Sequence, residues 1–357
     1  MDMYSNGRGA IYRLKRLYES YGYSQYKMSK FEEYDLYVRN KSFLVSDHII
    51  TFTDTDGKLM ALKPDVTLSI VKNCREVERG VSRVYYDENV YRVPKGAISF
   101  KEITQAGLEC IGQLDLQSVS EVLMLAAKSL ELICEDYVLD VSHMGILSAL
   151  VDGLGLSVAG KAKLLSYVGE KNVHGISEIC ADEGLDPDAV KTLVRLVSMK
   201  GGCDEMLEIL RDTRVYPDAC ELAKIVSAVC ERGGKARIDF SVTDDMKYYS
   251  GIVFKGFVKG VPTSLLSGGR YDNLMKKMGK QSGAIGFAVY LDLIGDLDAD
   301  VNEYDVDTIL LYDDSTPLAD LMLLADSLRD GGATVRSMRE LPDGLKYRRI
   351  VDKREGR

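Results

Sequence analysis

The stretch Thr104-Gln105-Ala106-Gly107-Leu108-Glu109 decides how this chain is interpreted. In a β-strand alternate side chains share one face, so Gln105, Gly107 and Glu109 would lie together. An amide and a carboxylate would then flank a glycine, which leaves room for a ligand to approach the sheet. Such a patch suits a polar cation, although Gln and Glu are also typical of a strand face that water solvates.

An antiparallel hairpin is predicted around this stretch. Residues 81–92 and 100–111 are rich in strand-forming residues, and a loop with Pro94 and Gly96 joins them. The flanking segments predict a helix at 11–21, two strands within 43–62 around the turn 54–57, a short helix at 66–74 after Pro64 and an apolar helix at 119–135.

The second half of the chain changes pattern several times. Residues 144–232 show helical periodicity with glycine punctuation, which predicts a helical insertion. The pattern then predicts strands at 236–242 and 248–258, a turn at 267–272, a helix at 273–278, a buried stretch at 284–294, a β-α-β unit over 308–337 and a solvated basic tail at 346–357.

The composition is that of an ordinary globular protein, with 46% apolar and 28% charged residues in a chain of 357. The net charge of −9 argues against general binding to phosphate backbones, so no nucleic-acid partner is expected. No apolar run approaches the roughly 18 residues of a membrane span, and the N-terminus has no signal-peptide core. We therefore expect a cytoplasmic protein without a membrane partner.

Cysteine and histidine usage indicates no metal site. The seven cysteines are odd in number and none forms a C-x-x-C pair, so neither a disulfide framework nor a zinc site is predicted. The three histidines, His48, His143 and His174, do not stand at metal-ligand spacing. We expect no metal and no cofactor.

Four segments in a fixed order carry a resemblance to a known family. They are Lys63-Pro64-Asp65-Val66-Thr67, Arg92 with Gln105 to Glu109, Tyr248-Tyr249-Ser250-Gly251-Ile252-Val253-Phe254, and Gly268-Gly269-Arg270-Tyr271-Asp272 with Gly286-Phe287-Ala288. This ordered set resembles histidyl-tRNA synthetases over residues 8–145 and 236–300. The resemblance implies an α+β fold, namely the antiparallel sheet of class II aminoacyl-tRNA synthetases flanked by helices. The core would comprise residues 1–143 and 236–300, with a helical insertion at 144–235 and a short C-terminal α/β unit with its basic tail at 301–357.

The resemblance also implies a histidine-binding pocket. Asp65, Thr67 and Gln105 would hold the ammonium group, and Glu109 with Tyr249 would hold the imidazole. The implied ligand-binding set is Asp65, Thr67, Gln105, Glu109, Tyr248 and Tyr249, with Arg92 as an additional pocket residue. Simpler roles stay open, because Asp65 or Thr67 could cap the helix after Pro64 and Tyr249 could be a core residue.

Departures from the synthetase pattern bear on activity. Asp244 and Leu293 stand where the family has arginines that act on the carboxylate and the ATP phosphates, and bulky Tyr290 replaces a glycine. Val93 and Pro94 follow Arg92 where the family has His-Glu. Arginines aimed at developing charge each supply several kcal/mol, so no intrinsic aminoacylation and no catalytic residue are expected.

A kept histidine pocket with a lost ATP site is similar to the regulatory subunits of ATP phosphoribosyltransferase. That resemblance implies a non-catalytic chain that binds free histidine and regulates a short-form catalytic subunit in the first step of histidine biosynthesis. Such cores are usually homodimers, here within a hetero-oligomer. A divergent histidyl-tRNA synthetase and a stand-alone histidine sensor are the alternatives.

Overall fold

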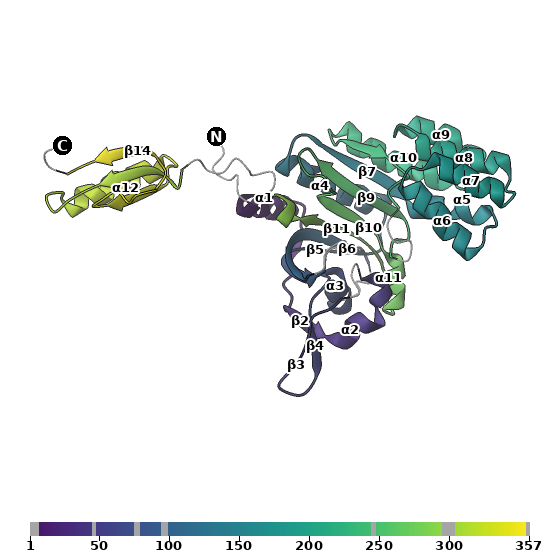
Figure 1. The fold of residues 1–357 in the computed structure, drawn as a ribbon, viewed down its shortest axis with the longest axis horizontal. Coiled ribbons are helices and arrows are strands. Elements are labelled where there is room, and N and C mark those ends of the chain that lie inside the picture. Colours follow the sequence, from purple (N-terminus) through teal and green to yellow (C-terminus); the bar gives the residue numbers. More distant parts are fainter. Residues whose placement is uncertain are drawn as a thin grey trace. The chain divides into compact units, whose positions relative to one another are not determined.

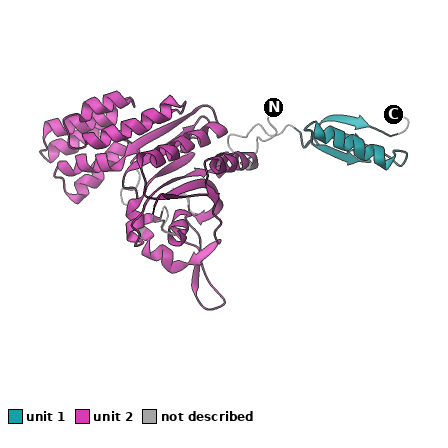
Figure 2. Ribbon diagram, turned by 180° about the vertical axis from the view of Figure 1, so that it is seen from behind, with its two compact units in different colours: residues 1–6, 297–357 teal, residues 7–296 magenta. Residues whose placement is uncertain are grey.

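The computed structural model describes residues 7–44, 48–74, 79–93, 99–243, 248–294 and 304–354. The loop with Pro94 and Gly96 and the departure at Asp244 lie outside these residues. The chain divides into two compact units, a large unit of residues 7–296 and a C-terminal unit that contains residues 297–357 (Figure 2). Among the described residues, no helix has the length and apolar character required to cross a membrane.

An eight-stranded sheet forms the centre of the large unit (Figure 1). Its strands, in spatial order, are β1 (Ser24–Gln25), β5 (Val81–Arg92), β6 (Lys101–Gly112), β11 (Gly283–Tyr290), β10 (Leu266–Arg270), β9 (Ile252–Val258), β7 (Tyr137–His143) and β8 (Ala236–Ile238). Neighbours from β5 to β7 are antiparallel, whereas the outer pairs β1–β5 and β7–β8 are parallel. The predicted hairpin is the long β5–β6 pair.

Two helices cover one face of this sheet. In α4 (Leu116–Ile133) most residues are buried, and Asp115 caps it by accepting a hydrogen bond from the Ser118 backbone N–H at 2.8 Å. The amphipathic α1 (Gly7–Ser20) packs against α4, and the hydroxyl groups of Tyr18 and Ser129 are hydrogen-bonded at 3.1 Å. Tyr18 also contacts the Phe287 ring edge-on, which joins α1 to β11. The opposite face carries both polar residues and an apolar cluster that includes Tyr86, Val90 and Ala284.

A second, smaller sheet lies beside the open face. It consists of β2 (Phe31–Glu33), β4 (Leu59–Leu62) and β3 (Thr51–Thr53), and the expected turn joins β3 to β4 at Asp54–Gly57. Gly57 has a φ of 78°, which an L-residue rarely adopts. The connecting helices are α2 (Tyr34–Arg39), the 3₁₀ turn η1 (Lys41–Phe43), α3 (Thr67–Asn73) and α11 (Asp272–Lys277).

Between β7 and β8 the chain is helical, as the periodicity predicts. The helices are α5 (Met144–Gly153), α6 (Val158–Gly169), α7 (Val173–Asp182), α8 (Pro187–Ser198), α9 (Cys203–Leu210) and α10 (Tyr216–Glu231). Helices α5 to α8 share an apolar core that includes Leu164, Ile176 and Leu193, and α10 packs against α9 and against α4 of the main body. Figure 1 shows them gathered beside β7.

The C-terminal unit contains β12 (Val306–Leu311), α12 (Leu318–Asp330), β13 (Val335–Met338) and β14 (Tyr347–Asp352). Its sheet order is β13-β12-β14, with both pairs parallel. The prediction of a solvated tail from residue 346 is therefore wrong for 347–352, because this basic segment pairs with β12. Most residues of this strand are at least partly exposed, and its arginines give it the composition of a solvated tail.

Two further local predictions are wrong. The segment 267–272 is not a turn, because residues 266–270 form strand β10 between β9 and β11. Tyr248 and Tyr249 precede β9, which begins at Ile252, so they are not part of the strand predicted at 248–258. The pair Gly268-Gly269 resembled a turn, but these glycines make space for neighbouring strands. A Cβ atom on Gly268 would overlap the Gly286 carbonyl group and the Phe287 side chain.

We expect Gly268→Ala to lower the free energy of unfolding by about 1–3 kcal/mol, because overpacking in a buried strand displaces its neighbours. Chemical denaturation with circular dichroism measures the change. Gly153→Ala is the matched control, since the nearest atom to its added Cβ is 3.9 Å away and alanine favours the helix. Equal stability of the two variants would contradict the role assigned to Gly268.

Candidate ligand-binding site

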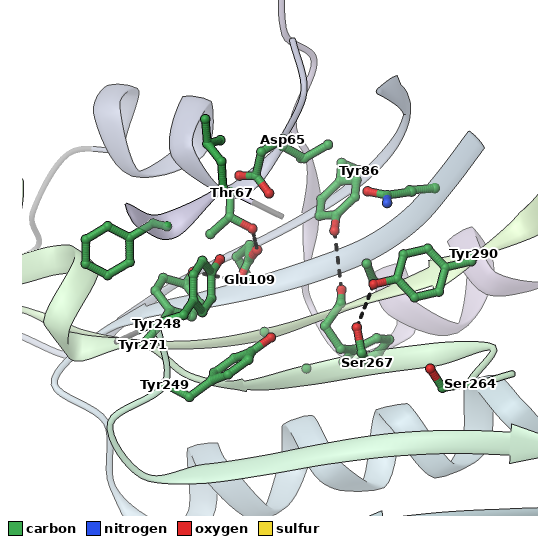
Figure 3. A pocket seen from close by; sticks show the side chains of 18 of the residues that line it. Asp65, Thr67, Tyr86, Glu109, Tyr248, Tyr249, Ser264, Ser267, Tyr271 and Tyr290 are labelled. Atoms are coloured by element: carbon green, nitrogen blue, oxygen red, sulfur yellow. Dashed lines mark hydrogen bonds between the residues drawn. The ribbon is translucent and has the colours of Figure 1, made fainter. Parts of the chain in front are cut away.

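A cavity of about 680 Å³ opens on the sheet face that α1 and α4 leave uncovered (Figure 3). Strands β5, β6, β9, β10 and β11 and the start of α3 contribute to its walls. All seven residues expected at the pocket line this cavity: Asp65, Thr67, Arg92, Gln105, Glu109, Tyr248 and Tyr249. Segments far apart in sequence therefore converge as the motif order implied.

Glu109 is the most constrained of these side chains. It is only 2% exposed, and two hydroxyl groups donate hydrogen bonds to its carboxyl group. Thr67 donates to Oε1 at 2.8 Å and Tyr271 donates to Oε2 at 2.6 Å. Below it, Gly286 on β11 leaves the space that Glu109 fills, because any Cβ there would overlap the carboxyl group. Thr67, expected at the ammonium, is thus bonded to Glu109.

The environment of Glu109 changes its acidity. Its pKa is raised from 4.5 to about 8, mainly by burial and in small part by the nearby Asp65 charge. The hydrogen bonds from Tyr271 and Thr67 act in the opposite direction, since they stabilise the ionised form. The net effect is a carboxyl group that titrates near neutral pH.

The glycine beside Glu109 does not leave an open space, contrary to expectation. Tyr86 stands opposite Gly107 in the β5–β6 register, and its ring covers the glycine. The Tyr86 hydroxyl donates a hydrogen bond to the Phe287 carbonyl oxygen at 3.4 Å. Gly107 is needed because a Cβ there would overlap Tyr86, so this glycine makes room for protein atoms.

Asp65 combines both roles that the sequence left open. Its Oδ1 accepts a hydrogen bond from the Leu68 backbone N–H at 2.9 Å, which satisfies a donor in the first turn of α3. The same side chain lines the cavity. Burial raises its pKa, while the Leu68 N–H and the positive charge of Arg92 lower it. Asp65 is therefore an acceptor at the cavity wall that is fixed in place by the helix.

Arg92 and Gln105 lie in the cavity wall, and among the described residues their side chains have no hydrogen-bond partner. Arg92 is 8% exposed and Gln105 is 5% exposed. Buried guanidinium and amide groups cost free energy unless they are paired, so both are available to a ligand.

Aromatic rings form the wall next to Glu109. The Tyr248 ring centroid lies 4.7 Å from that of Tyr249 and 5.9 Å from those of Tyr271 and Phe43. Burial raises the pKa of Tyr248 and Tyr271 well above the ordinary value, so both hydroxyl groups stay protonated donors. These rings offer a flat, apolar surface beside a polar group.

Sequence reasoning missed several residues of the site, among them Tyr271 and Tyr86. Tyr271 belongs to the quoted Gly268–Asp272 segment but was given no role, and its place after two strand glycines was the available clue. Tyr86 lies in the predicted strand opposite Gly107. Of the departures, Tyr290 lines the cavity, whereas Leu293 lies in the 3₁₀ turn η2 (Leu291–Ile294) and does not. Among the described residues, no group of His, Cys, Asp or Glu is arranged to hold a metal ion.

Comparisons with known proteins agree with this geometry. The histidyl-tRNA synthetase family matches residues 6–294. An ATP phosphoribosyltransferase regulatory subunit from Clostridium kluyveri is 30% identical over 336 residues, which cover 89% of this chain and 85% of that protein. A histidine–tRNA ligase from Methanocaldococcus jannaschii is 26% identical over 353 residues, which cover 95% of this chain and 83% of the ligase.

Solved structures share the fold. The crystal structure of an ATP phosphoribosyltransferase regulatory subunit/histidyl-tRNA synthetase from Bacillus halodurans has a TM-score of 0.78 at 23% identity, covering 98% of this chain and 94% of that chain. The ATP phosphoribosyl transferase (HisG:HisZ) complex from Thermotoga maritima gives a TM-score of 0.63 at 17% identity, covering 79% of this chain and 96% of that chain.

The sheet, its two covering helices and the family match define a class II aminoacyl-tRNA synthetase-like protein of the histidyl type, which confirms the expected fold class. Within this class, the chain belongs to the family of ATP phosphoribosyltransferase regulatory subunits. The family is regulatory, as the departures from the synthetase pattern predicted.

The Glu109 pKa makes stability depend on pH. Between pH 4.5 and about 8 the folded chain keeps a proton that the unfolded chain has released, so the free energy of unfolding falls as pH rises. The slope is about 1.4 kcal/mol per pH unit. Glu109→Gln removes this contribution, and its stability relative to the parent should increase from pH 5 to pH 8 in denaturation experiments.

Tyr271→Phe is the companion variant. It removes a hydrogen bond that lowers the Glu109 pKa, so the loss of stability should extend to higher pH. If the difference in the free energy of unfolding between the parent and Glu109→Gln does not change with pH, the pKa of Glu109 has an ordinary value.

Proposed function

We propose that this regulatory subunit binds free histidine in the described cavity and thereby controls a short-form catalytic subunit at the first step of histidine biosynthesis. The observation that carries the proposal is the buried Glu109 carboxyl group, which Thr67 and Tyr271 fix beside the Tyr248 and Tyr249 rings. An imidazole is a flat ring with two nitrogen atoms at its edge. It fits an aromatic wall that ends in a polar group.

The protonation of Glu109 favours imidazole over other side chains. With a pKa of about 8, the carboxyl group carries a proton over much of the neutral range. Imidazole, whose conjugate acid has a pKa near 6.5 in ordinary surroundings, can accept a hydrogen bond from the protonated carboxyl group or, once protonated itself, form a charge-assisted pair with the carboxylate. A side chain without a basic nitrogen atom cannot do this, which supports specificity for histidine.

The other end of the cavity suits the backbone groups of a free amino acid. Asp65 and the Gln105 amide oxygen are acceptors for an ammonium group. Arg92 is a buried cation without an acceptor in the described part of the chain, and the ligand carboxylate would supply one. Asp65 and Gln105 thus offer acceptors for the ammonium group of an amino acid, and Arg92 offers a positive charge for its carboxylate.

Regulation of a partner follows from linkage. A ligand that binds one conformation or assembly state more tightly shifts the population toward that state. The effect is reciprocal, so binding of the catalytic subunit would change the affinity for histidine by the same factor. The similar Thermotoga maritima structure is a complex of two components, HisG and HisZ, which supports assembly with a partner in this family.

Histidine binding is tested by isothermal titration calorimetry. We expect the parent chain to bind histidine and Glu109→Gln to bind it about 10- to 100-fold more weakly, because a buried charge-assisted hydrogen bond contributes about 1.5–3 kcal/mol. Glu102→Gln is the matched control, since Glu102 lies on the same strand and is exposed. It should bind like the parent.

If Glu109→Gln and the parent bind histidine equally, the cavity is not the histidine site. Feedback inhibition of the assembled enzyme should weaken in the same variant. Unchanged inhibition would place the regulatory site elsewhere, for example at the subunit interface.

Assembly is tested by mixing this chain with its cognate short-form catalytic subunit. Sedimentation velocity should show the regulatory chain as a homodimer and the mixture as a larger hetero-oligomer with raised phosphoribosyltransferase activity. Absence of a complex at micromolar concentrations would contradict the regulatory assignment of this partner.

A divergent histidyl-tRNA synthetase is the second candidate, and the 26% identity to an archaeal histidine–tRNA ligase over 95% of the chain favours it. Tyr290 and Leu293 weigh against it. Histidine-dependent pyrophosphate exchange separates the two functions, since only a synthetase supports it. Histidine binding without exchange and without a complex would instead indicate a stand-alone sensor.

A further inference from the structure

Three residues of β11 face the cavity and increase in size along the strand. The register places Gly286 opposite Glu109, Ala288 opposite Gly107 and Tyr290 opposite Gln105. The cavity floor is therefore low at the Glu109 end, where the two small residues lie. It rises at the Gln105 end, where a phenol ring stands on the same face.

The Tyr290 ring is fixed across the floor. Its hydroxyl group is hydrogen-bonded to the Ser267 hydroxyl at 2.7 Å, and its backbone N–H donates to the Leu265 carbonyl oxygen at 2.8 Å. Ser267 lies on the neighbouring strand β10, opposite Ala288 of β11. The hydrogen bond to Ser267 therefore directs the Tyr290 ring from β11 toward β10. Figure 3 shows this pair on the side of the cavity away from Thr67 and Glu109.

We propose that the Tyr290–Ser267 pair narrows the carboxylate end of the cavity and selects a free amino acid over the same amino acid with a bulky group on its carboxylate. This inference rests on the proposed histidine site. With the imidazole at Glu109 and the ammonium at Asp65, the carboxylate is the remaining substituent and would lie toward Arg92 and Tyr290. Arg92 can pair with its negative charge, and the Tyr290 ring narrows the space for an added group before the cavity continues to Ser264 and Lys255.

The physical basis is steric. A tyrosine side chain held at its hydroxyl group and at its backbone has little freedom to move aside, so an added ring on the ligand would meet packed atoms. A charge effect is separate, because an ester or amide also removes the negative charge that faces Arg92. The test must therefore vary size and charge independently.

Calorimetry with three ligands makes this separation: histidine, histidinamide and histidine benzyl ester. The amide loses the charge and adds little bulk, whereas the ester loses the charge and adds a ring. In the parent we expect the ester to bind at least tenfold more weakly than the amide. In Tyr290→Ala the two derivatives should bind within about threefold of each other, with histidine affinity changed less than tenfold.

Two milder variants keep the test valid if Tyr290→Ala does not fold. Ser267→Ala and Tyr290→Phe each remove the hydroxyl pair but keep the ring, so the ester-to-amide ratio should fall only partly. Equal binding of ester and amide by the parent overturns the selectivity while histidine binding, and thus the proposed function, stands. An unchanged ratio in folded Tyr290→Ala also overturns it. A parent that binds none of the three ligands overturns both.

Discussion

Burial of the Glu109 carboxyl group costs free energy, and three separate segments of the chain supply what keeps it in place. The start of α3 brings Thr67, the end of β10 brings Tyr271, and β11 contributes a glycine where any side chain would collide. The antiparallel order β5-β6-β11-β10 is what brings these segments together. The sheet thus places one polar group at the centre of the cavity, while α1 and α4 cover the opposite face.

The arrangement explains which parts of the fold were predictable from sequence. Long elements such as α4 and the β5–β6 hairpin follow from hydrophobic periodicity and alternation. The strand β10 did not, because Gly268 and Gly269 have the composition of a turn, and only the close approach of β9 and β11 gives them a reason to be extended. The strand β14 was missed because its arginines indicate exposed side chains, and exposed side chains do not show whether the backbone pairs with another strand.

The site shows the same division. Ordered motifs were sufficient to name seven cavity residues, since each motif carries a residue type that suits part of an amino acid. They could not show that Tyr86 fills the place beside Gly107 or that Thr67 is bonded to Glu109. Those contacts depend on cross-strand register and on the angle at which α3 meets the sheet. Neither quantity is encoded within one segment.

The parallel pairing of β7 with β8 changes how the helical segment between them should be regarded. The chain leaves the sheet at His143 and returns at Ala236 beside Leu139, running in the same direction. Parallel neighbours cannot be joined by a tight turn, because the connection must travel back along the full strand. The six helices are therefore a greatly enlarged crossover connection. Any shortening in evolution or by design must leave at least one element long enough to bridge that length, so this region can shrink but cannot vanish while β8 stays in the sheet.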